Sequence, residues 1–291
     1  MKKRHIILFV IIGLLCGLIS LFITLYPLLS NYFAEKNKST VHTAYTQTVD
    51  TMRDDSIEAM RQAARAYNAA LAASPVTLGG AFTEEGQESA EEDYYDLLNV
   101  LVNGIMGYIE IPKISVYLPI YHSTHSDVLQ LGVGHLTGSS LPVGGADTHT
   151  ILAGHSGLAR EKMFSDLEQI DIGDVFYLHV LDETLAYEVD RIKTVLPENT
   201  DYLSIEKGED YCTLITCVPF GVNTHRLLVR GTRVEYAPEG EVNQPIYPEE
   251  AAVISTWEQQ YLKGLLYGGG LVIVLLPVAI LMLRRGGHAR T

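Results

Sequence analysis

The chain has 291 residues, of which 47% are hydrophobic, and a formal net charge of −14 at pH 7. This acidic balance argues against nucleic-acid binding, which needs clustered lysine and arginine to neutralise phosphates. The three cysteines are too few for a disulfide framework.

A first apolar stretch covers residues 6–29, after a basic N-terminus at residues 1–5. A helix of about 20 residues spans the hydrocarbon core of a bilayer, which is about 30 Å thick. A cleaved signal peptide would have a shorter apolar core and a small-residue cleavage site, which Tyr32-Phe33-Ala34 does not supply. We therefore expect an uncleaved transmembrane anchor, with a cleaved signal peptide as the alternative.

Residues 30–104 are expected to form an extracellular helical segment that contains a loop. Apolar residues recur at helical spacing from about residue 50 to 73, which predicts an amphipathic helix. Pro75 follows this pattern, and the glycine-rich, acidic stretch at about 76–92 has the composition of a solvated loop. A second short helix is predicted over residues 94–102.

From residue 105 to 236 the apolar pattern changes to period two, which is typical of strands. Six to eight short strands, without strict alternation of strand and helix, predict a mainly β domain folded as a closed or nearly closed barrel. The expected strands are Gly107–Ile111, Val116–Ile120, Thr148–Ala153, Val175–Val180, Leu185–Val195, Tyr211–Thr216 and Leu227–Tyr236.

The chain is then expected to return to the membrane. Residues 237–260 are rich in proline and glutamate, as linkers are. Residues 261–283 form a second apolar stretch, in which glycines and Pro277 are tolerated by a transmembrane helix. Basic residues at 1–5 and in the tail at 284–291 place both termini in the cytoplasm by the positive-inside rule. The predicted location is the cell membrane, with the domain between the spans outside.

Cys217 ends an apolar strand and stands directly before Val218-Pro219. Pro219 has no backbone donor and should end the strand pairing, which leaves the thiol facing a loop. If Cys212 lies on the same strand, five residues separate the two by about 16 Å, which is well beyond the reach of a disulfide. Taken alone, a cysteine here is more often a small buried apolar residue.

Two further residues give Cys217 a chemical context. Arg226 begins the next expected strand, and a short turn between antiparallel strands would place it beside the thiol. There it would favour the thiolate and hydrogen-bond a developing oxyanion. His155 follows another apolar strand, and its unperturbed pKa of about 6.5 suits proton transfer to and from amines. Taken singly, a surface arginine and a packed histidine are the commoner interpretations.

We expect no metal site. Too few cysteine or carboxylate residues accompany His122 and His125 to complete a metal site. The remaining histidines of this region, His135, His149 and His225, are interpreted as structural.

Together these residues resemble the sortases, and specifically their pilus-assembling class C. The resemblance covers nearly the whole chain, and the joint presence of His155, Cys217 and Arg226 makes it specific. The matching blocks are Ile105-Met106-Gly107-Tyr108-Ile109-Glu110-Ile111-Pro112-Lys113-Ile114, Gly132-Val133-Gly134-His135-Leu136, Ser140-Leu141-Pro142-Val143-Gly144-Gly145, Thr148-His149-Thr150 with Ala153-Gly154-His155, Thr213-Leu214-Ile215-Thr216-Cys217, and Asn223-Thr224-His225-Arg226.

The resemblance implies an eight-stranded sortase β-barrel with short helices, flanked by two transmembrane helices, and a two-stage acyl transfer without metal or organic cofactor. Cys217 would attack the Thr-Gly peptide of an LPxTG-like sorting signal to form a thioester. His155 would protonate the departing amine and Arg226 would stabilise the oxyanion. A lysine amine of a pilin subunit would then resolve the thioester and polymerise pili on the surface of a Gram-positive cell. A second, C-terminal span is also a class C feature.

The sequence departs from the class C pattern in its lid. Many members resemble one another in an Asp-Pro-aromatic motif, whose ring covers the catalytic cysteine and whose aspartate meets the catalytic arginine. Here the corresponding residues are Gly80-Ala81-Phe82. The hypothesis is that Phe82 still covers the site but closes it weakly. The alternative is a connector with one exposed phenylalanine.

Three other functions fit parts of this pattern. Attachment of surface proteins to cell-wall peptidoglycan uses the same thioester with a different amine, and is the leading alternative. Hydrolysis of the thioester would make the protein a sorting-signal protease. A catalytically silent binding module would have lost the cysteine, histidine or arginine, whereas this sequence retains all three.

Overall fold

The residues that the computed structural model describes are 41–73, 92–156 and 163–236, with Phe22, Tyr26 and Lys263 as isolated positions. The chain divides into two compact units, residues 1–241 and 242–291. All the strands and helices described below belong to the first unit.

Several predicted segments lie outside the described residues. They are the loop at about 76–92 as far as residue 91, with Phe82, the linker at 237–260, both termini at 1–5 and 284–291, and, apart from the three isolated positions, the spans at 6–29 and 261–283. Within the described part of the chain, no helix combines the length and apolar character that crossing a bilayer requires.

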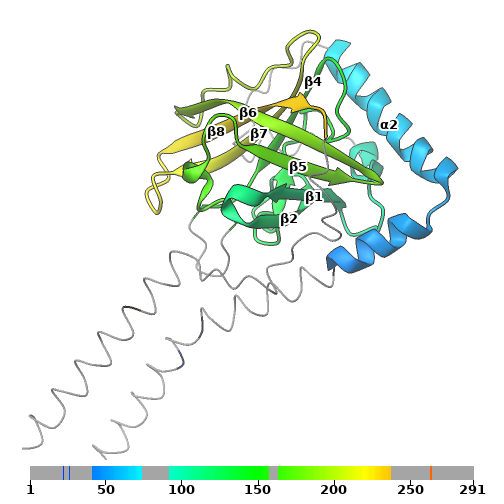
Figure 1. Cartoon of the computed structure of the whole chain (residues 1–291), viewed down its shortest axis with the longest axis horizontal. Helices are drawn as coiled ribbons and strands as arrows, with labels where there is room; N and C mark the ends of the chain where they lie inside the picture. The colour runs from blue at the N-terminus through cyan, green and yellow to red at the C-terminus, as the bar shows by residue number, and fades with distance from the viewer. Residues whose placement is uncertain are drawn as a thin grey trace, which may run out of the picture. The chain divides into compact units, whose positions relative to one another are not determined.

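Eight strands form a closed barrel in the order β1-β2-β3-β4-β7-β8-β6-β5, and Figure 1 labels all of them except β3. The mainly β, eight-stranded architecture is therefore confirmed. The strands are β1 (Ile105–Ile111), β2 (Val116–His122), β3 (Val133–His135), β4 (Thr148–Ala153), β5 (Val175–Val180), β6 (Glu183–Val195), β7 (Asp210–Val218) and β8 (His225–Val234).

Two pairings at the centre of this order bring distant parts of the sequence together. β4 and β7 pair in parallel, from Thr148 with Asp210 to Ala153 with Ile215. β7 and β8 form an antiparallel hairpin. β8 also pairs with β6, so it lies between β6 and β7. The ends of β4, β7 and β8 therefore meet at one rim of the barrel.

Side chains of β4, β7 and β8 alternate between two apolar clusters, because successive residues of a strand point to opposite faces. Residues such as Leu152, Leu214 and Val229 belong to the main core, inside the barrel. Their neighbours on the outer face join a second, smaller cluster. That cluster consists of Leu136, Ile151, Val195, Leu203, Ile215 and Leu228, with Ala153 packed against it.

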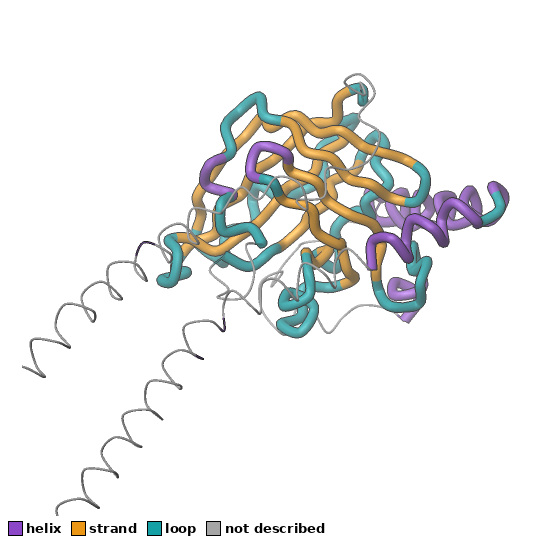
Figure 2. The backbone as a smooth tube through the Cα atoms, turned by 60° about the horizontal axis from the view of Figure 1, so that its bottom comes forward, coloured by secondary structure: helices purple, strands orange, loops and turns teal. Residues whose placement is uncertain are grey.

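The helix predicted at about 50–73 is present, and a further helical piece that the sequence did not predict precedes it. Residues 41–51 are helical, and α2 (Asp54–Ala73) begins after a break, with Asp54 and Asp55 in its first turn. Acidic residues are favourable at a helix N-terminus because they oppose the helix dipole. Both pieces lie on one side of the barrel (Figures 1 and 2).

Polar side chains hold these helices on the barrel. Tyr45 donates a hydrogen bond to the Met106 carbonyl and accepts one from the Leu181 amide, both at 3.0 Å. The buried Asn68 amide bonds both backbone groups of Leu141, at 2.7 and 3.0 Å. These contacts join the helices to backbone groups of the barrel domain, and buried backbone groups need such hydrogen-bond partners.

Two local elements differ from the sequence expectation. The stretch predicted as a helix over 94–102 contains a short 3-10 helix, η1 (Glu92–Asp96), followed by turns. β3 has three residues, which is too short for a period-two pattern to reveal.

Candidate active site

Cys217 lies one residue before the end of β7, and its Cα partner across the hairpin is Arg226. The sequence expectation that the two residues lie side by side is confirmed. Cys217 is half-buried. The hairpin turn continues from Pro219, whose carbonyl accepts hydrogen bonds from the amides of Val222 and Asn223 at 3.0 Å. The thiol is therefore held at a strand end beside a compact turn.

The Arg226 guanidinium lies against this turn. Its Nη1 donates to the carbonyls of Asn223 and His225, both at 3.2 Å. Asn223 adopts a left-handed backbone conformation with φ of 60°, which asparagine tolerates better than most residues. The shape of the turn thus helps to set the position of the cation next to Cys217.

His155 follows β4 by two residues, at the same rim. The Gly154 amide donates to the Ile215 carbonyl at 3.0 Å, and the Thr216 hydroxyl donates to the Gly154 carbonyl at 2.8 Å. Since Ala153 pairs with Ile215, the parallel register continued by two residues places His155 level with Cys217. The structure therefore brings the three predicted residues to neighbouring positions on three adjacent strand ends.

All three residues belong to the outer face of the barrel. Cys217 shares a face with Ile215, and Arg226 with Leu228, because their spacing along each strand is two. His155 continues the face of Ile151 and Ala153. The site is thus a row across the outer surface, next to the apolar row of Ala153, Ile215 and Leu228.

The space beside residue 154 is too small for any side chain larger than that of glycine. A Cβ added there would lie 2.6 Å from the ring of Phe164, which is fully buried. The Phe164 amide also donates to the His155 carbonyl at 3.0 Å. These contacts fix the backbone on both sides of His155. The sequence gives no sign of these roles of Thr216 and Phe164, since no local pattern connects either residue with His155.

Partial burial lowers the pKa of His155 below its usual value of 6.5, because desolvation disfavours the imidazolium. A neutral imidazole at physiological pH can accept a proton from the thiol. Cys212, by contrast, is fully buried on the inner face of β7, and burial raises the pKa of its thiol well above 9. Alternation along one strand therefore separates a buried, inert thiol from an accessible one.

His122 and His135 have structural surroundings. His122 lies between the carbonyls of Gly104 and Leu97, at 2.9 and 2.7 Å. His135 contacts the Tyr94 hydroxyl at 2.8 Å and the Ser140 carbonyl at 2.9 Å. Among the described residues, no group of three or more His, Cys, Asp or Glu side chains is arranged to hold a metal ion.

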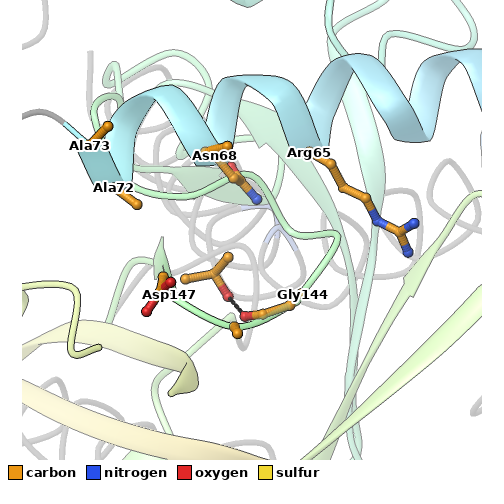
Figure 3. A pocket seen from close by; sticks show the side chains of 10 residues that line it. Arg65, Asn68, Ala72, Ala73, Gly144 and Asp147 are labelled. Carbon is orange, nitrogen blue, oxygen red and sulfur yellow. Dashed lines mark hydrogen bonds between the residues drawn. The ribbon is translucent and has the colours of Figure 1, made fainter. Parts of the chain in front are cut away.

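A cavity of about 490 Å³ lies away from this row, between the C-terminal part of α2 and the turn at 144–148 (Figure 3). Arg65 and Asn68 line one wall, and Asp147 lies on the other. This turn precedes β4, whereas His155 follows it. Seven residues at about 3.3 Å each separate Thr148 from His155 by roughly 23 Å. The cavity therefore lies at the opposite end of β4 from the candidate site.

Comparison with known proteins gives consistent matches. Residues 109–234 match the family described as the sortase domain. The chain is 31% identical to sortase D of Bacillus subtilis over 131 residues, which are 44% of this chain and 63% of that protein. It is 30% identical to sortase A of Bacillus anthracis over 130 residues, 45% of this chain and 60% of that protein. The chain thus spans less than two thirds of these curated relatives.

Solved structures match more extensively. Sortase C of Streptococcus pneumoniae superposes with a TM-score of 0.63 at 44% identity, covering 68% of this chain and 97% of that one. Sortase C1 of Streptococcus agalactiae gives a TM-score of 0.61 at 42% identity, with 68% and 100% covered. Sortase C-1 of Actinomyces oris gives 0.57 at 45% identity, with 62% and 99% covered.

Proposed function

The chain belongs to the sortase family, with class C enzymes as its structural neighbours, and we propose that it is a cysteine transpeptidase that polymerises pili. The observation that carries the proposal is the pairing of Cys217 with Arg226, with His155 level with the thiol on the adjacent strand end. Nucleophile, proton-transfer group and oxyanion donor are the groups that acyl transfer needs.

In the first stage, the Cys217 sulfur attacks the threonine carbonyl carbon of an LPxTG-like sorting signal. The thiol proton passes to the neutral His155 imidazole as the C–S bond forms. Arg226 donates hydrogen bonds to the oxygen that gains negative charge. When the C–N bond breaks, His155 returns the proton to the departing glycine amine, and the thioester remains on Cys217.

In the second stage, a lysine amine of a pilin subunit attacks the thioester. His155 takes a proton from the amine and returns one to the departing Cys217 sulfur, so an isopeptide bond forms and the enzyme is regenerated. Similarity to sortase C enzymes supports a pilin acceptor. The S. pneumoniae structure was described as giving insights into catalysis and pilin substrate specificity.

Transfer to pilin is tested by competition between acceptors. The full-length chain in detergent is incubated with an LPxTG-type peptide, a pilin with an accessible lysine and a peptidoglycan stem peptide with a free amine, and products are mapped by mass spectrometry. We expect an isopeptide bond on the pilin lysine. Products on the stem peptide alone would favour cell-wall attachment, and a free threonine carboxylate alone would favour a protease.

We further propose that the protein sits in the cell membrane, with the barrel outside and both termini inside. The apolar stretches at 6–29 and 261–283 and their basic flanks support this arrangement. A membrane-impermeant thiol reagent applied to intact cells should label Cys217. Labelling only after cell lysis would contradict the orientation.

A further inference from the structure

The edge of β4 that faces β3 has a strand partner over only part of its length. β3 pairs with β4 at Leu152 and Ala153. β4 begins at Thr148, and residues 148–151 are all buried. The amides on this buried part of the edge therefore need hydrogen-bond acceptors from elsewhere.

Two serine side chains supply those acceptors. The His149 amide donates to the Ser140 hydroxyl at 3.0 Å, and the Ile151 amide donates to the Ser139 hydroxyl at 3.3 Å. The Ser140 amide donates in turn to the His149 carbonyl at 3.1 Å. Both serine side chains are buried. The two serines thus take the place of a strand neighbour along this part of β4.

His135 holds this pair of serines in place. Its Nε2 lies 2.9 Å from the Ser140 carbonyl and 3.2 Å from the Ser139 hydroxyl. Because a carbonyl can only accept, Nε2 carries the ring proton and donates to Ser140. Burial lowers the pKa of His135 to about 4, so the ring is neutral at physiological pH and its Nδ1 is an acceptor.

Tyr94 supplies the donor to His135. Its hydroxyl donates to Nδ1 at 2.8 Å and accepts from the Ser123 amide at 3.2 Å. Tyr94 is 2% exposed, and burial raises the pKa of its hydroxyl above the usual value of 10, so the proton needed for donation is retained. Tyr94 belongs to η1, before the barrel. The Tyr94 network, which consists of Tyr94, His135, Ser139 and Ser140, therefore joins this segment to the edge of β4.

The strand that the Tyr94 network holds leads directly to His155. Ile151, whose amide bonds Ser139, also accepts from the Leu136 amide at 2.9 Å, and it lies on the same face of β4 as His155. The other edge of β4 pairs with β7, which carries Cys217. His155 stays level with Cys217 only if β4 is fixed along both edges. A misplacement of about 1 Å at a catalytic group can cost about a hundredfold in rate.

We propose that Tyr94 is a positioning residue for His155: through the Tyr94 network, its hydroxyl fixes the edge of β4 and so keeps His155 level with Cys217. The proposal rests on the proposed function for the reaction in which His155 acts. Tyr94 is buried and lies outside the row of Cys217, Arg226 and His155. Loss of its hydroxyl should therefore slow the chemical step at Cys217 and leave peptide binding nearly unchanged.

The titration of His155 reports its position independently of the reaction. Partial burial lowers the pKa of His155, so a movement of β4 that exposes the ring to water should let this pKa rise toward 6.5. The ionisable residues on the elements around His155 stay unchanged in the variants below. They are Cys217 on β7, His225 and Arg226 on β8, and Asp166 and Glu168 on the segment that follows Phe164.

Two variants of the network and one matched control test the proposal. Tyr94→Phe removes the hydroxyl and keeps the ring, and Ser139→Ala removes one acceptor on the β4 edge. Tyr45→Phe is the control, because Tyr45 is also a buried tyrosine before the barrel. Its hydroxyl bonds Met106 of β1 and Leu181 after β5, and neither strand pairs with β4.

Thioester formation is followed by intact mass in single turnovers of the full-length protein in detergent, with a saturating LPxTG-type peptide. We expect the rate to fall about tenfold in Tyr94→Phe and Ser139→Ala, and to stay within about twofold of wild type in Tyr45→Phe. The Kd for the labelled peptide, measured by anisotropy in a Cys217→Ala background, should change less than about threefold in all three. NMR titration should give a higher His155 midpoint in the first two variants only.

An unchanged His155 midpoint in Tyr94→Phe would overturn the proposal, whatever the rate. An equal loss of rate in Tyr45→Phe and Tyr94→Phe would also overturn it, because loss of any buried hydroxyl would then have the same effect. If wild type forms no thioester, the proposed transpeptidase function is refuted. In that case a His155 midpoint that rises in Tyr94→Phe and not in Tyr45→Phe would still support the positioning role of Tyr94.

Discussion

At the scale of single residues, the alternation of side chains along β7 decides which cysteine can do chemistry. Cys212 points into the barrel and Cys217 to its outer face, because an odd number of positions, five, separates them on one strand. The sequence was sufficient to identify Cys217, Arg226 and His155 as candidates, because each lies at the end of an apolar strand and the three occur together in blocks that resemble the sortases. It could not identify Thr216 or Phe164, whose contacts with Gly154 and His155 join segments distant in sequence.

The two thiols should differ in reactivity. A small alkylating reagent at pH 7.5 should modify Cys217 at least a hundredfold faster than Cys212, because burial raises the pKa of Cys212 and excludes the reagent. Peptide mapping by mass spectrometry gives both rates in one sample. Comparable rates for the two cysteines in native protein would contradict the assignment of faces on β7.

His155 should titrate below its usual value. Since burial lowers the pKa of His155, the neutral ring persists to a pH below 6.5 and protonates only under more acidic conditions. We expect the acidic limb of kcat/KM to have its midpoint below pH 6.5, and NMR titration of the His155 ring to give the same midpoint. An imidazole midpoint above 6.5 would mean that a nearby anion, and not desolvation, dominates at this site.

At the scale of elements, strand ends and their supports account for the geometry of the site. The period-two pattern predicted most of the strands, but it missed β3, which has only three residues. The sequence also predicted a helix over 94–102, whereas the structure has the short 3-10 helix η1, which ends at Asp96. Tyr94 is buried there and bonds His135 of β3. This tertiary contact competes with helical propensity, which is a weak determinant in short segments.

Gly154→Ala should destabilise the backbone that follows the C-terminal end of β4, next to His155. The new methyl group would meet the Phe164 ring at 2.6 Å, and overpacking of this kind costs about 1–3 kcal/mol. We expect a lower melting temperature and slower thioester formation. The double variant Gly154→Ala with Phe164→Leu should recover part of both, because the smaller side chain leaves room. Equal activity of the single variant and wild type would show that the backbone beside His155 does not need this close contact.

At the scale of the whole molecule, the pairing of β7 with both β4 and β8 is what brings the three residues together. The sequence predicted a barrel from the number and length of its strands. It could not predict by itself that β7 pairs in parallel with β4, because this pairing joins residues about 60 positions apart and depends on packing of the complete sheet. The parallel register sets His155 level with Cys217, so the site exists only in the folded barrel.

Buried neutral histidines should make the whole barrel sensitive to acid. Burial lowers the pKa of both His135 and His149 to about 4. Between pH 6.5 and about 4 the unfolded chain binds these protons and the native protein does not, so the free energy of unfolding falls as pH falls. Each histidine contributes about 1.4 kcal/mol per pH unit within this range.

Urea unfolding of the full-length protein at several pH values measures this slope. The slope should decrease in His135→Gln, which removes one titrating group, even if the variant is less stable at every pH. An unchanged slope in the variant would show that other groups cause the acid sensitivity. The adjacent Arg230 lowers the pKa of Asp190 from its usual 3.8, so protonation of Asp190 should reduce the free energy of unfolding only at lower pH.

The most direct test of the account is the intact mass of the full-length protein after incubation with an LPxTG-type peptide. We expect a mass increase equal to the acyl fragment that ends in threonine, located on Cys217 and released by hydroxylamine. The adduct should be absent in Cys217→Ala, strongly reduced in His155→Ala and Arg226→Ala, and retained in Cys212→Ala. An adduct that persists in Cys217→Ala, or its complete absence from wild type with sorting peptides of varied sequence, would contradict the assignment of Cys217 as the nucleophile of a transpeptidase.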